Sequence, residues 1–335
     1  MAVRVKTNRV VTLANRPTGF PTEADFELVE APVPEAGPGE LLVRMRWTSV
    51  DPYQRGRMSE SRSYAKPVQV GEVMTAQSVG EVVESNDSRF AEGDLVVGQL
   101  GWQEYAVARG GAVRKVHPAL DPPTLALHAV GATGFTAYFG VLDVGQPKPG
   151  DTVVVSGAAG AVGQIAGQIA KLAGCRAVGI AGGPEKCADL LELYGYDAAV
   201  DYKSESFRDD LKAAVPNGVD VYFDNCGGSI SATVHSRLNV GARIPICGQI
   251  SQYNAERPEP TFAPGLLIVF RARMEGFLVS DYASRFDEAA MRLGRWVLEG
   301  KIRWREHVTE GLENAPRAFI GMLNGENRGK ALVKL

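Results

Sequence analysis

The pattern of apolar and polar residues changes near residue 124. Before it, short segments alternate apolar and polar positions, as strands with one buried face do. They are LLVRMRW (41–47), SVGEVVES (78–85), GDLVVGQ (93–99) and EYAVAR (104–109). Turn sequences such as GPGE (37–40) separate them, since glycine tolerates tight-turn dihedrals. This pattern predicts a small β-domain.

After residue 124, continuous apolar runs alternate with helical segments of about ten residues, as in βαβ units. The runs are DTVVVSG (151–157), RAVGIAG (176–182), AAVDY (198–202), VDVYFDN (219–225), ARIPICG (242–248) and MEGFLV (274–279). Helices are expected at 161–173 and near 185–194. Apolar strands separated by helices indicate a parallel sheet covered on both faces, and right-handed crossovers favour a doubly wound order.

The end of the chain returns to a mixed pattern. An amphipathic helix is predicted over 284–300, and the final strand, KALVKL (330–335), is expected to rejoin the β-domain. The predicted fold class is therefore α/β. Residues 1–124 and 299–335 form the β-domain, and residues 125–298 form an inserted doubly wound domain. Two domains also suit 335 residues, because a single core usually stops growing at about 250–300 residues.

Charge and composition exclude several partners. The 36 basic and 39 acidic residues give a net charge of −3, so nothing attracts nucleic acid or an anionic membrane. No apolar run approaches the ~20 residues that span a bilayer, and the segment LLIVF (266–270) is interpreted as buried core. Four scattered cysteines indicate a reducing compartment, so a cytoplasmic location is expected.

The segment VVVSGAAGAVGQIAGQIAKLAG (153–174) carries the main binding signal. In the dinucleotide fingerprint G-x-G-x-x-G, Ala158 replaces the first glycine, and Gly160 and Gly163 occupy the second and third positions. The second glycine lets pyrophosphate approach the helix N-terminus, and the third lets helix and strand pack closely. A ligand-free packing joint is the alternative. Dinucleotide binding is favoured because the turn opens a series of βα units.

The end of the next strand indicates which dinucleotide binds. In IAGGPEKCADLL (180–191), Gly182 and Gly183 stand where an NAD site usually has an acid. Free amides, the dipole of a helix starting at Pro184, and Lys186 would meet a 2′-phosphate there. Alternatively, Lys186 is solvated and Glu185 binds the ribose, but Glu185 is expected inside the helix. The sequence therefore favours NADP(H).

Several motifs together resemble one known family. They are SVDPYQRGRM (49–58), GATGFTAYFG (131–140), SGAAGAVGQ (156–164), YFDNCGG (222–228), CGQISQYN (247–254), EGFLVS (275–280) and GENRGKALV (325–333). The chain is similar over essentially its whole length to the zinc-independent medium-chain dehydrogenase/reductase superfamily, and within it to the leukotriene B4 dehydrogenase/prostaglandin reductase-like (double-bond reductase) group. The resemblance implies a GroES-like β-domain, an inserted Rossmann domain and NADPH as hydride donor.

The resemblance also implies cofactor positions. The pyrophosphate would lie on Gly160, Ala161, Val162 and Gly163, and the 2′-phosphate on Gly182, Lys186 and Tyr202. The rest of the cofactor would meet Cys247, Gly248, Ile250, Ser251, Phe277, Leu278 and Val279, with Asn327 reaching the phosphates. Asn225 is a candidate because it ends the fourth strand of the series, where such sheets bind ligands. Cys226 and Cys247 are interpreted as small core residues.

No metal is expected. Catalytic zinc needs cysteine, histidine and carboxylate ligands, and the corresponding segments, SVDPYQR (49–55) and GEVM (71–74), hold neither cysteine nor histidine. An enolate formed without a metal needs hydrogen-bond donors. The resemblance points to Tyr53 and Tyr253 as these donors. Each could instead be a structural tyrosine with its hydroxyl tied into a loop.

Three neighbouring side chains carry weaker hypotheses. Arg55 and Arg57 could attract an acidic substrate, but a solvated loop is the preferred interpretation. Tyr64 is a weaker candidate for the wall of the substrate cleft. Water and tyrosine both remain open as the source of the α-carbon proton.

The resemblance implies reduction of the C=C bond of α,β-unsaturated ketones and aldehydes by NADPH. The substrate would be a small electrophilic alkene, and the chain would form a homodimer. One alternative is an NADPH-dependent quinone reductase of the same superfamily. Another is a non-catalytic, NADPH-binding regulatory protein.

Overall fold

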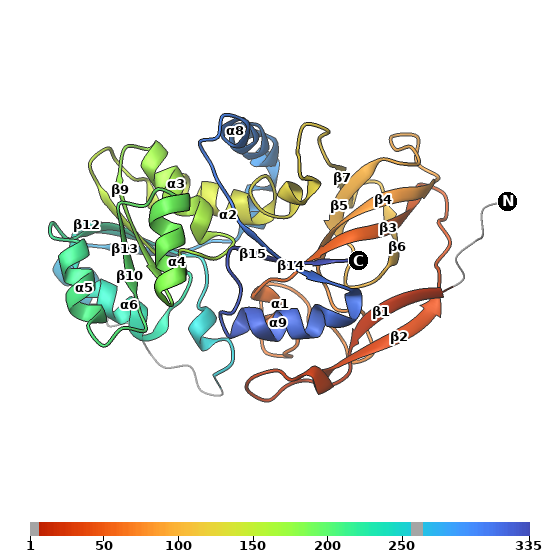
Figure 1. Cartoon of the computed structure of the whole chain (residues 1–335), viewed down its shortest axis with the longest axis horizontal. Coiled ribbons are helices and arrows are strands. Elements are labelled where there is room, and N and C mark those ends of the chain that lie inside the picture. Colours follow the sequence, from red (N-terminus) through yellow and green to blue (C-terminus); the bar gives the residue numbers. More distant parts are fainter. Residues whose placement is uncertain (1–6, 256–263) are drawn as a thin grey trace. The chain divides into compact units, whose positions relative to one another are not determined.

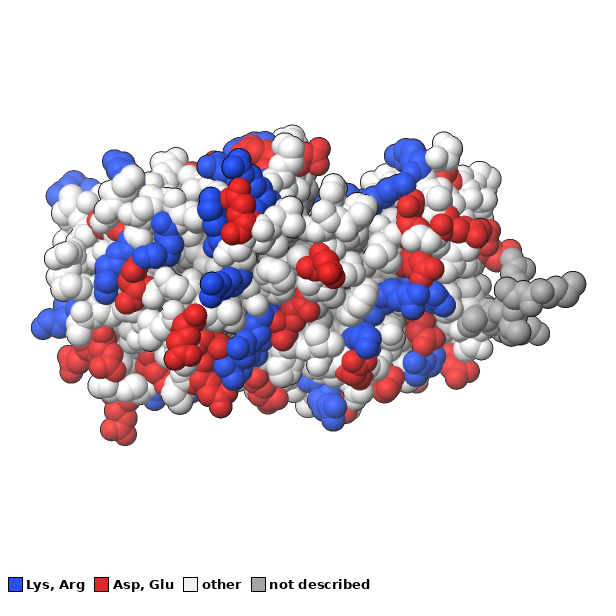
Figure 2. Space-filling view, turned by 45° about the horizontal axis from the view of Figure 1, so that its top comes forward, with Lys and Arg blue, Asp and Glu red and all other residues white. Residues whose placement is uncertain are grey.

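The computed structural model describes residues 7–255 and 264–335 (Figure 1). It divides into two compact units. The first comprises the chain up to Leu127 together with Glu306–Leu335, and the second comprises His128–Arg305. The boundaries between the two units, at 127/128 and 305/306, lie a few residues beyond the boundaries predicted at 124/125 and 298/299. On the face shown in Figure 2, basic and acidic side chains are interspersed, in keeping with the near-neutral net charge.

Contacts with helix α3 (Gly163–Leu172) explain the position of the second boundary, at 305/306. The Gln168 side chain accepts a hydrogen bond from the backbone N–H of Arg303 at 2.8 Å, and the Gln164 side chain accepts one from Arg305 at 2.9 Å. Both glutamines are buried. Because these bonds tie residues 303–305 to α3, the chain stays with the second unit up to Arg305.

The first unit is built on an antiparallel sheet in the order β14-β15-β3-β4-β5-β7, with β6 also paired to β3. The bounds are β3 Glu40–Ser49, β4 Gln77–Ser85, β5 Leu95–Gln99, β6 Tyr105–Arg109, β7 Val113–Lys115, β14 Glu306–Glu310 and β15 Lys330–Lys334. The four strands predicted in this part of the chain are confirmed. The return of the C-terminus is confirmed as well, because β15 pairs antiparallel with β3. Only the β14–β15 pair is parallel.

Three further elements complete the first unit. Strands β1 (Thr7–Leu13) and β2 (Phe26–Pro32) form a separate antiparallel hairpin, which the sequence did not predict. Helix α1 (Tyr53–Arg57) follows β3, and helix α9 (Ala315–Leu323) precedes β15. A buried cluster of Phe26, Trp102 and Phe319, with ring centroids 5.8–6.0 Å apart, joins β2 and α9 to the main sheet.

The second unit contains the predicted parallel sheet. Its order, β10-β9-β8-β11-β12-β13, is doubly wound, and its neighbouring strands pair in parallel. The bounds are β8 Thr152–Ser156, β9 Arg176–Ala181, β10 Ala198–Asp201, β11 Val219–Phe223, β12 Leu238–Ile246 and β13 Arg273–Gly276. All six predicted strands are present. The last ends at Gly276, so Phe277–Val279 belong to the segment after it.

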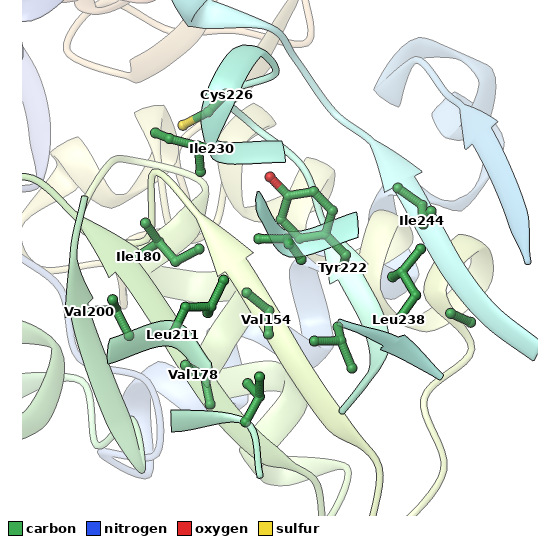
Figure 3. Close-up of a cluster of buried hydrophobic side chains, with 14 residues drawn as sticks. Val154, Val178, Ile180, Val200, Leu211, Tyr222, Cys226, Ile230, Leu238 and Ile244 are labelled. Atoms are coloured by element: carbon green, nitrogen blue, oxygen red, sulfur yellow. The ribbon is translucent and has the colours of Figure 1, made fainter. Parts of the chain in front are cut away.

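Helices cover this sheet, which explains its continuous apolar strands. Figure 3 shows a core cluster that contains Val154 and Val178 of the sheet, Leu211 of α5 (Phe207–Ala214) and Ile230 of α6 (Gly228–His235). Every residue of β8 is buried. Burial of both faces is why these strands lack alternation. The remaining helices are α2 Ala132–Phe139, α4 Pro184–Ala188, α7 Pro264–Phe270 and α8 Phe286–Leu298.

One expectation about the core is wrong. The LLIVF segment forms most of helix α7, and its Ile268 and Val269 are 79% and 62% exposed. Neither α7 nor any other helix in the described part of the chain is long and apolar enough to cross a membrane. An apolar run of five residues cannot by itself distinguish a buried strand from an exposed helix face.

Candidate cofactor and substrate site

The glycine turn between β8 and α3 has the geometry expected of a pyrophosphate-binding turn. A Cβ atom added to Gly163 would lie 2.3 Å from the Gly157 carbonyl oxygen and 2.6 Å from the Ala158 Cα, so no side chain fits there. A Cβ on Gly160 would meet a single atom within 4 Å, the Gly157 oxygen at 3.2 Å. Gly163 therefore serves packing, whereas Gly160 faces open space. This is the division of roles predicted for the third and second glycines.

Tyr196 fixes the start of α3, a contact the sequence did not reveal. Its buried hydroxyl donates to the Gly163 carbonyl at 2.7 Å. A Cβ on Gly167 would fall within the Tyr196 ring, so α3 lies close against it. The helix N-terminus that would receive the pyrophosphate is thus held in one position.

The proposed 2′-phosphate region follows β9. The Tyr202 ring lies against Gly182, where a Cβ would come within 2.8 Å of it. Helix α4 begins at Pro184 as predicted, and Glu185 and Lys186 lie inside it. The Gly183 N–H is not one of the free amides expected in this region, because it donates to the Asp201 carboxylate at 2.9 Å.

Asp224, at the carboxyl end of β11, organises the next loop and was missed by the sequence reasoning. One oxygen of this buried carboxylate accepts hydrogen bonds from the backbone N–H groups of Cys226 and Gly227, both at 2.9 Å. It also accepts the Ser156 hydroxyl at 3.0 Å, and its other oxygen accepts the Ser231 hydroxyl at 2.6 Å. An acid that ends an apolar strand just before a glycine pair was the available signal.

Asp224 also connects this loop to the loop after β12. Its backbone carbonyl accepts the N–H groups of Cys247 at 2.8 Å and Gly248 at 3.1 Å. The neighbouring Asn225 side chain donates to the Ser156 carbonyl at 2.7 Å and so joins β11 to β8. Asn225 therefore lies at the predicted edge, with its amide engaged in a structural contact.

A shallow, open hollow of about 450 Å³ lies at the carboxyl ends of β12 and β13. Its lining includes five predicted site residues, which are Cys247, Gly248, Tyr253, Phe277 and Leu278. Ile250 and Ser251 lie in the short helical turn beside it, and Val279 begins another such turn after β13. The structure thus brings together residues that are about 30 positions apart in the sequence, as the carboxyl edge of a parallel sheet does.

Two side chains shape this hollow. The Tyr253 hydroxyl oxygen accepts the Gln249 N–H at 3.3 Å. The Phe277 ring meets Phe223 edge-on, with centroids 6.3 Å apart. A Cβ on Gly140 would lie 2.4 Å from Phe277, so this glycine gives the ring its space.

The cysteines near the hollow are protonated at neutral pH. Burial raises the pKa of Cys226 and of Cys247 to about 12, and the nearby Asp224 carboxylate adds to the shift. Thiols with such pKa values are poor nucleophiles. Cys226 is a buried core residue as predicted, whereas Cys247 is half-buried at the edge of the hollow.

In the first unit, Tyr53 begins α1 and is half-buried. Burial raises the pKa of its hydroxyl well above 10, and the Asp51 carboxylate raises it further. The Gln99 side-chain amide lies 3.3 Å from the hydroxyl oxygen. Tyr53 therefore keeps its proton throughout the neutral range and is a competent hydrogen-bond donor.

A buried ion pair holds the connection between β3 and α1. Lys330, from β15, is fully buried, and its ammonium donates to Asp51 at 2.6 Å and to the Val50 carbonyl at 2.9 Å. The buried Gln54 side chain accepts the Asp51 N–H at 2.8 Å and donates to the Thr75 carbonyl at 2.7 Å. Nothing in the KALVKL sequence indicated that Lys330 is internal.

The solvated interpretation of Arg55 and Arg57 is wrong. Both residues are buried, with 7% and 8% of their surface exposed. Arg55 donates to the Gly19 carbonyl at 2.8 Å. Asn327 lies in the first unit and donates to the Gly329 carbonyl at 2.7 Å, and its contact with a cofactor stays a prediction.

Comparison with known families covers both units. Residues 9–116 match a family described as the N-terminal domain of oxidoreductase, and residues 161–295 match one described as zinc-binding dehydrogenase. Within residues 7–255 and 264–335, no three His, Cys, Asp or Glu side chains cluster as metal ligands would. Independence from metal stays a prediction.

Full-length relatives define the family. NADPH-dependent curcumin reductase of Escherichia coli is 44% identical over 100% of this chain and 99% of its own. Prostaglandin reductase 1 of Rattus norvegicus is 45% identical over 96% of this chain and 98% of its own. The chain belongs to the medium-chain dehydrogenase/reductase superfamily. Within it, the chain groups with NADP-dependent double-bond reductases, which confirms the predicted enzyme class.

A solved structure supports the same assignment. CurA from Vibrio vulnificus, crystallised in complex with NADPH, is 45% identical over 97% of this chain and 98% of its own, with a TM-score of 0.93. The cofactor is therefore NADP(H), as predicted. The open space over Gly160 and the tyrosine-covered Gly182 fit a dinucleotide with an extended phosphate chain.

Proposed function

We propose that this protein reduces the C=C bond of α,β-unsaturated ketones and aldehydes with NADPH. The observation that carries the proposal is the position of the Tyr253 hydroxyl. It lies in the hollow at the ends of β12 and β13, with Phe277, in a chain that is similar over its full length to double-bond reductases. A carbonyl oxygen held in this hollow would have a tyrosine donor within reach.

The chemistry requires stabilisation of negative charge. Bound NADPH supplies a hydride to the β-carbon, and the substrate becomes an enolate. Hydrogen-bond donors aimed at the developing oxyanion lower this barrier, each by about 3–4 kcal/mol in well-studied cases. We assign this role to the hydroxyls of Tyr253 and Tyr53, together with ribose hydroxyls of the cofactor.

The two tyrosines suit the role for different reasons. The Tyr253 hydroxyl oxygen lies at the hollow and accepts the Gln249 N–H. Accepting that bond polarises the hydroxyl and makes it a better donor. Tyr53 stays protonated because burial and Asp51 raise its pKa. The Tyr53 hydroxyl therefore keeps its proton near neutral pH.

A substrate panel tests the proposal. NADPH consumption at 340 nm is followed with conjugated enones and enals, with the matching saturated carbonyl compounds and with quinones. Turnover of the enones and enals to saturated products is expected. Turnover of quinones alone would favour the quinone reductase, and tight NADPH binding without any turnover would favour a regulatory binding protein.

Tyrosine variants separate the two assigned donors. Tyr253→Phe and Tyr53→Phe each remove one hydroxyl and keep the ring, so NADPH affinity should change little. Each should lower kcat for the enone by about 10²-fold or more. Tyr105→Phe, in a β-strand of the first unit, is the matched control and should retain full activity. Full activity in both test variants would show that other groups hold the oxyanion.

We also propose that the chain forms a homodimer in the cytoplasm. Strand β13 is an edge of the parallel sheet, and the adjacent α7 exposes Ile268 and Val269. Among the described residues nothing pairs with the outer side of β13, and such an edge next to exposed apolar side chains favours pairing with another chain. Light scattering should give twice the mass of one chain, and Ile268→Lys should reduce it to the monomer. A wild-type monomer would contradict this.

A further inference from the structure

Arg57 closes the base of the loop that follows α1. It is the last residue of that helix, and its backbone carbonyl accepts the N–H of Val68 at 2.9 Å. Residues 58–68 therefore leave Arg57 and return to it. The loop carries Tyr64, a residue to which the proposed function gives no role.

The Arg57 side chain also holds the middle of this loop. One guanidinium nitrogen lies 3.1 Å from the Ala65 carbonyl oxygen and 3.4 Å from the Ser63 hydroxyl. The guanidinium carbon also lies 4.5 Å from the centroid of the ring of Tyr64, the residue between Ser63 and Ala65 in the sequence. Arg57 thus contacts the loop at its closing point, Val68, at its middle, Ala65, and at the Tyr64 ring.

The same guanidinium reaches the candidate oxyanion donor. It lies 5.8 Å from the centroid of the Tyr53 ring, so two tyrosine rings share one cation. Arg57 is 8% exposed, whereas Tyr64 is 62% exposed. The Tyr64 side chain is therefore largely exposed to solvent, while its ring also contacts the buried guanidinium of Arg57.

The charge of Arg57 has an unusual set of partners. Among the described residues, no carboxylate pairs with it. Its contacts are a carbonyl, a hydroxyl and two aromatic rings. Burial of a cation without a carboxylate is unfavourable, so this arrangement is a poor way to stabilise the fold. It is better suited to holding two aromatic rings in fixed positions.

We propose that Arg57 is a positioning residue. It holds Tyr64 and the loop of residues 58–68 beside Tyr53, as a fixed aromatic wall against which the conjugated substrate lies. The inference rests on the proposed function, because it takes Tyr53 to be a donor to the substrate. Arg57 itself touches neither the substrate nor the reacting atoms.

The test combines kinetics with hydrogen–deuterium exchange. Arg57→Met removes the cation and keeps most of the side-chain volume, and Arg57→Lys keeps the charge without the planar fork. Tyr64→Leu removes the ring from an exposed position where misfolding is not expected. The double variant of Arg57→Met with Tyr64→Leu completes a thermodynamic cycle. Each protein is assayed for kcat, KM, NADPH affinity and exchange in peptides covering residues 58–68.

Arg57→Met should lower kcat/KM for the enone by about 5- to 30-fold, mainly through KM. NADPH affinity should stay unchanged, and exchange should rise within residues 58–68. Arg57→Lys should lie between this variant and the wild type. Tyr64→Leu should lower kcat/KM similarly, and adding Arg57→Met to it should cause no further loss, because Arg57 acts through that ring.

The inference is overturned if the two losses multiply in the double variant, or if exchange in residues 58–68 is unchanged by Arg57→Met. It is also overturned if NADPH affinity falls by the same factor as kcat/KM, which would indicate general disruption. A wild-type protein without enone turnover would contradict the proposed function instead. In that case the exchange measurement still decides whether Arg57 holds the loop.

Discussion

Gly160→Ala and Gly163→Ala add the same methyl group to the same turn but should impair different properties, NADPH binding at Gly160 and stability at Gly163. At Gly163 the new Cβ would sit 2.3 Å and 2.6 Å from backbone atoms, so the turn or α3 must move. Overpacking of this kind costs about 1–3 kcal/mol, a fall in Tm on the order of 2–10 °C for a unit of this size. At Gly160 the only contact is at 3.2 Å, so Tm should change little.

For NADPH affinity, Gly160 should be the more sensitive of the two positions. A methyl on Gly160 would occupy space that the pyrophosphate needs, and should weaken NADPH binding by about 100-fold. At a concentration of 100 times the wild-type Kd, NADPH stabilises the wild type by about 2.7 kcal/mol and would stabilise Gly160→Ala by only ~0.4 kcal/mol.

Thermal unfolding with and without NADPH measures both effects in one assay. Gly160→Ala should match the wild type without NADPH and lose most of the NADPH-induced rise in Tm. Gly163→Ala should unfold at a lower temperature even without NADPH. The assignment of the turn is refuted if Gly160→Ala keeps the full NADPH-induced rise, or if Gly163→Ala is as stable as the wild type.

Three further predictions follow from other sites. Lys186→Ala should weaken NADPH binding far more than NADH binding, measured by fluorescence titration, and equal losses would show that Lys186 does not meet the 2′-phosphate. Lys330→Met leaves the buried Asp51 carboxylate unpaired and should lower the free energy of unfolding in urea by about 3–5 kcal/mol; adding Asp51→Asn should recover part of the loss, and no recovery would contradict the ion pair. Burial raises the pKa of Cys226 to about 12 from an ordinary 9.0, so the thiol loses its proton at a lower pH in the unfolded chain than in the folded one. The thiol therefore contributes its full stabilisation below pH 9, and the free energy of unfolding falls as the pH rises above 9. The free energy of unfolding should drop by about 1.4 kcal/mol per such cysteine between pH 8 and pH 10, and Cys226→Ala should reduce that drop by this amount; an unchanged pH dependence would rule out Cys226 as its source.

Periodicity predicted the parallel sheet well because both of its faces are covered. Strand β8 reads as an uninterrupted apolar run, and all of its residues are buried. The β1–β2 hairpin lacks such a signal. Strand β2 buries only Phe26 and leaves all of its other residues exposed or half-buried, so it has no apolar face to detect. Strand β2 is held in place by its pairing with β1 and by the contact of Phe26 with Trp102.

The candidate cofactor residues could be placed in the fold from the sequence, because they follow strand ends in a regular order. Gly160, Gly182 and Asn225 lie in the loops that follow β8, β9 and β11, where parallel sheets bind ligands. What local patterns could not supply is the set of buried polar partners. Asp224 and Lys330 are charged residues that the sequence places at apparently ordinary positions. They are internal only because donors and acceptors from distant segments surround them.

The same reason explains the error at Arg57. A polar loop with two arginines is typical of solvated surface, and no local pattern reveals that a guanidinium will be enclosed. Its burial depends on Tyr64 and Ala65, which return over it through the loop that Val68 closes. Such a closed loop has to be seen in three dimensions.

Hydride transfer to the β-carbon of an enone is the central claim, and isotope labelling tests it most directly. The protein is given NADPH deuterated at C4 of the nicotinamide, prepared with the label on either face, and a conjugated enone. The product is then analysed by NMR. With one of the two labelled cofactors, the account predicts a saturated ketone with one deuterium on the β-carbon. Deuterium on the carbonyl carbon of an alcohol product, or no deuterium transfer from either cofactor, would contradict it.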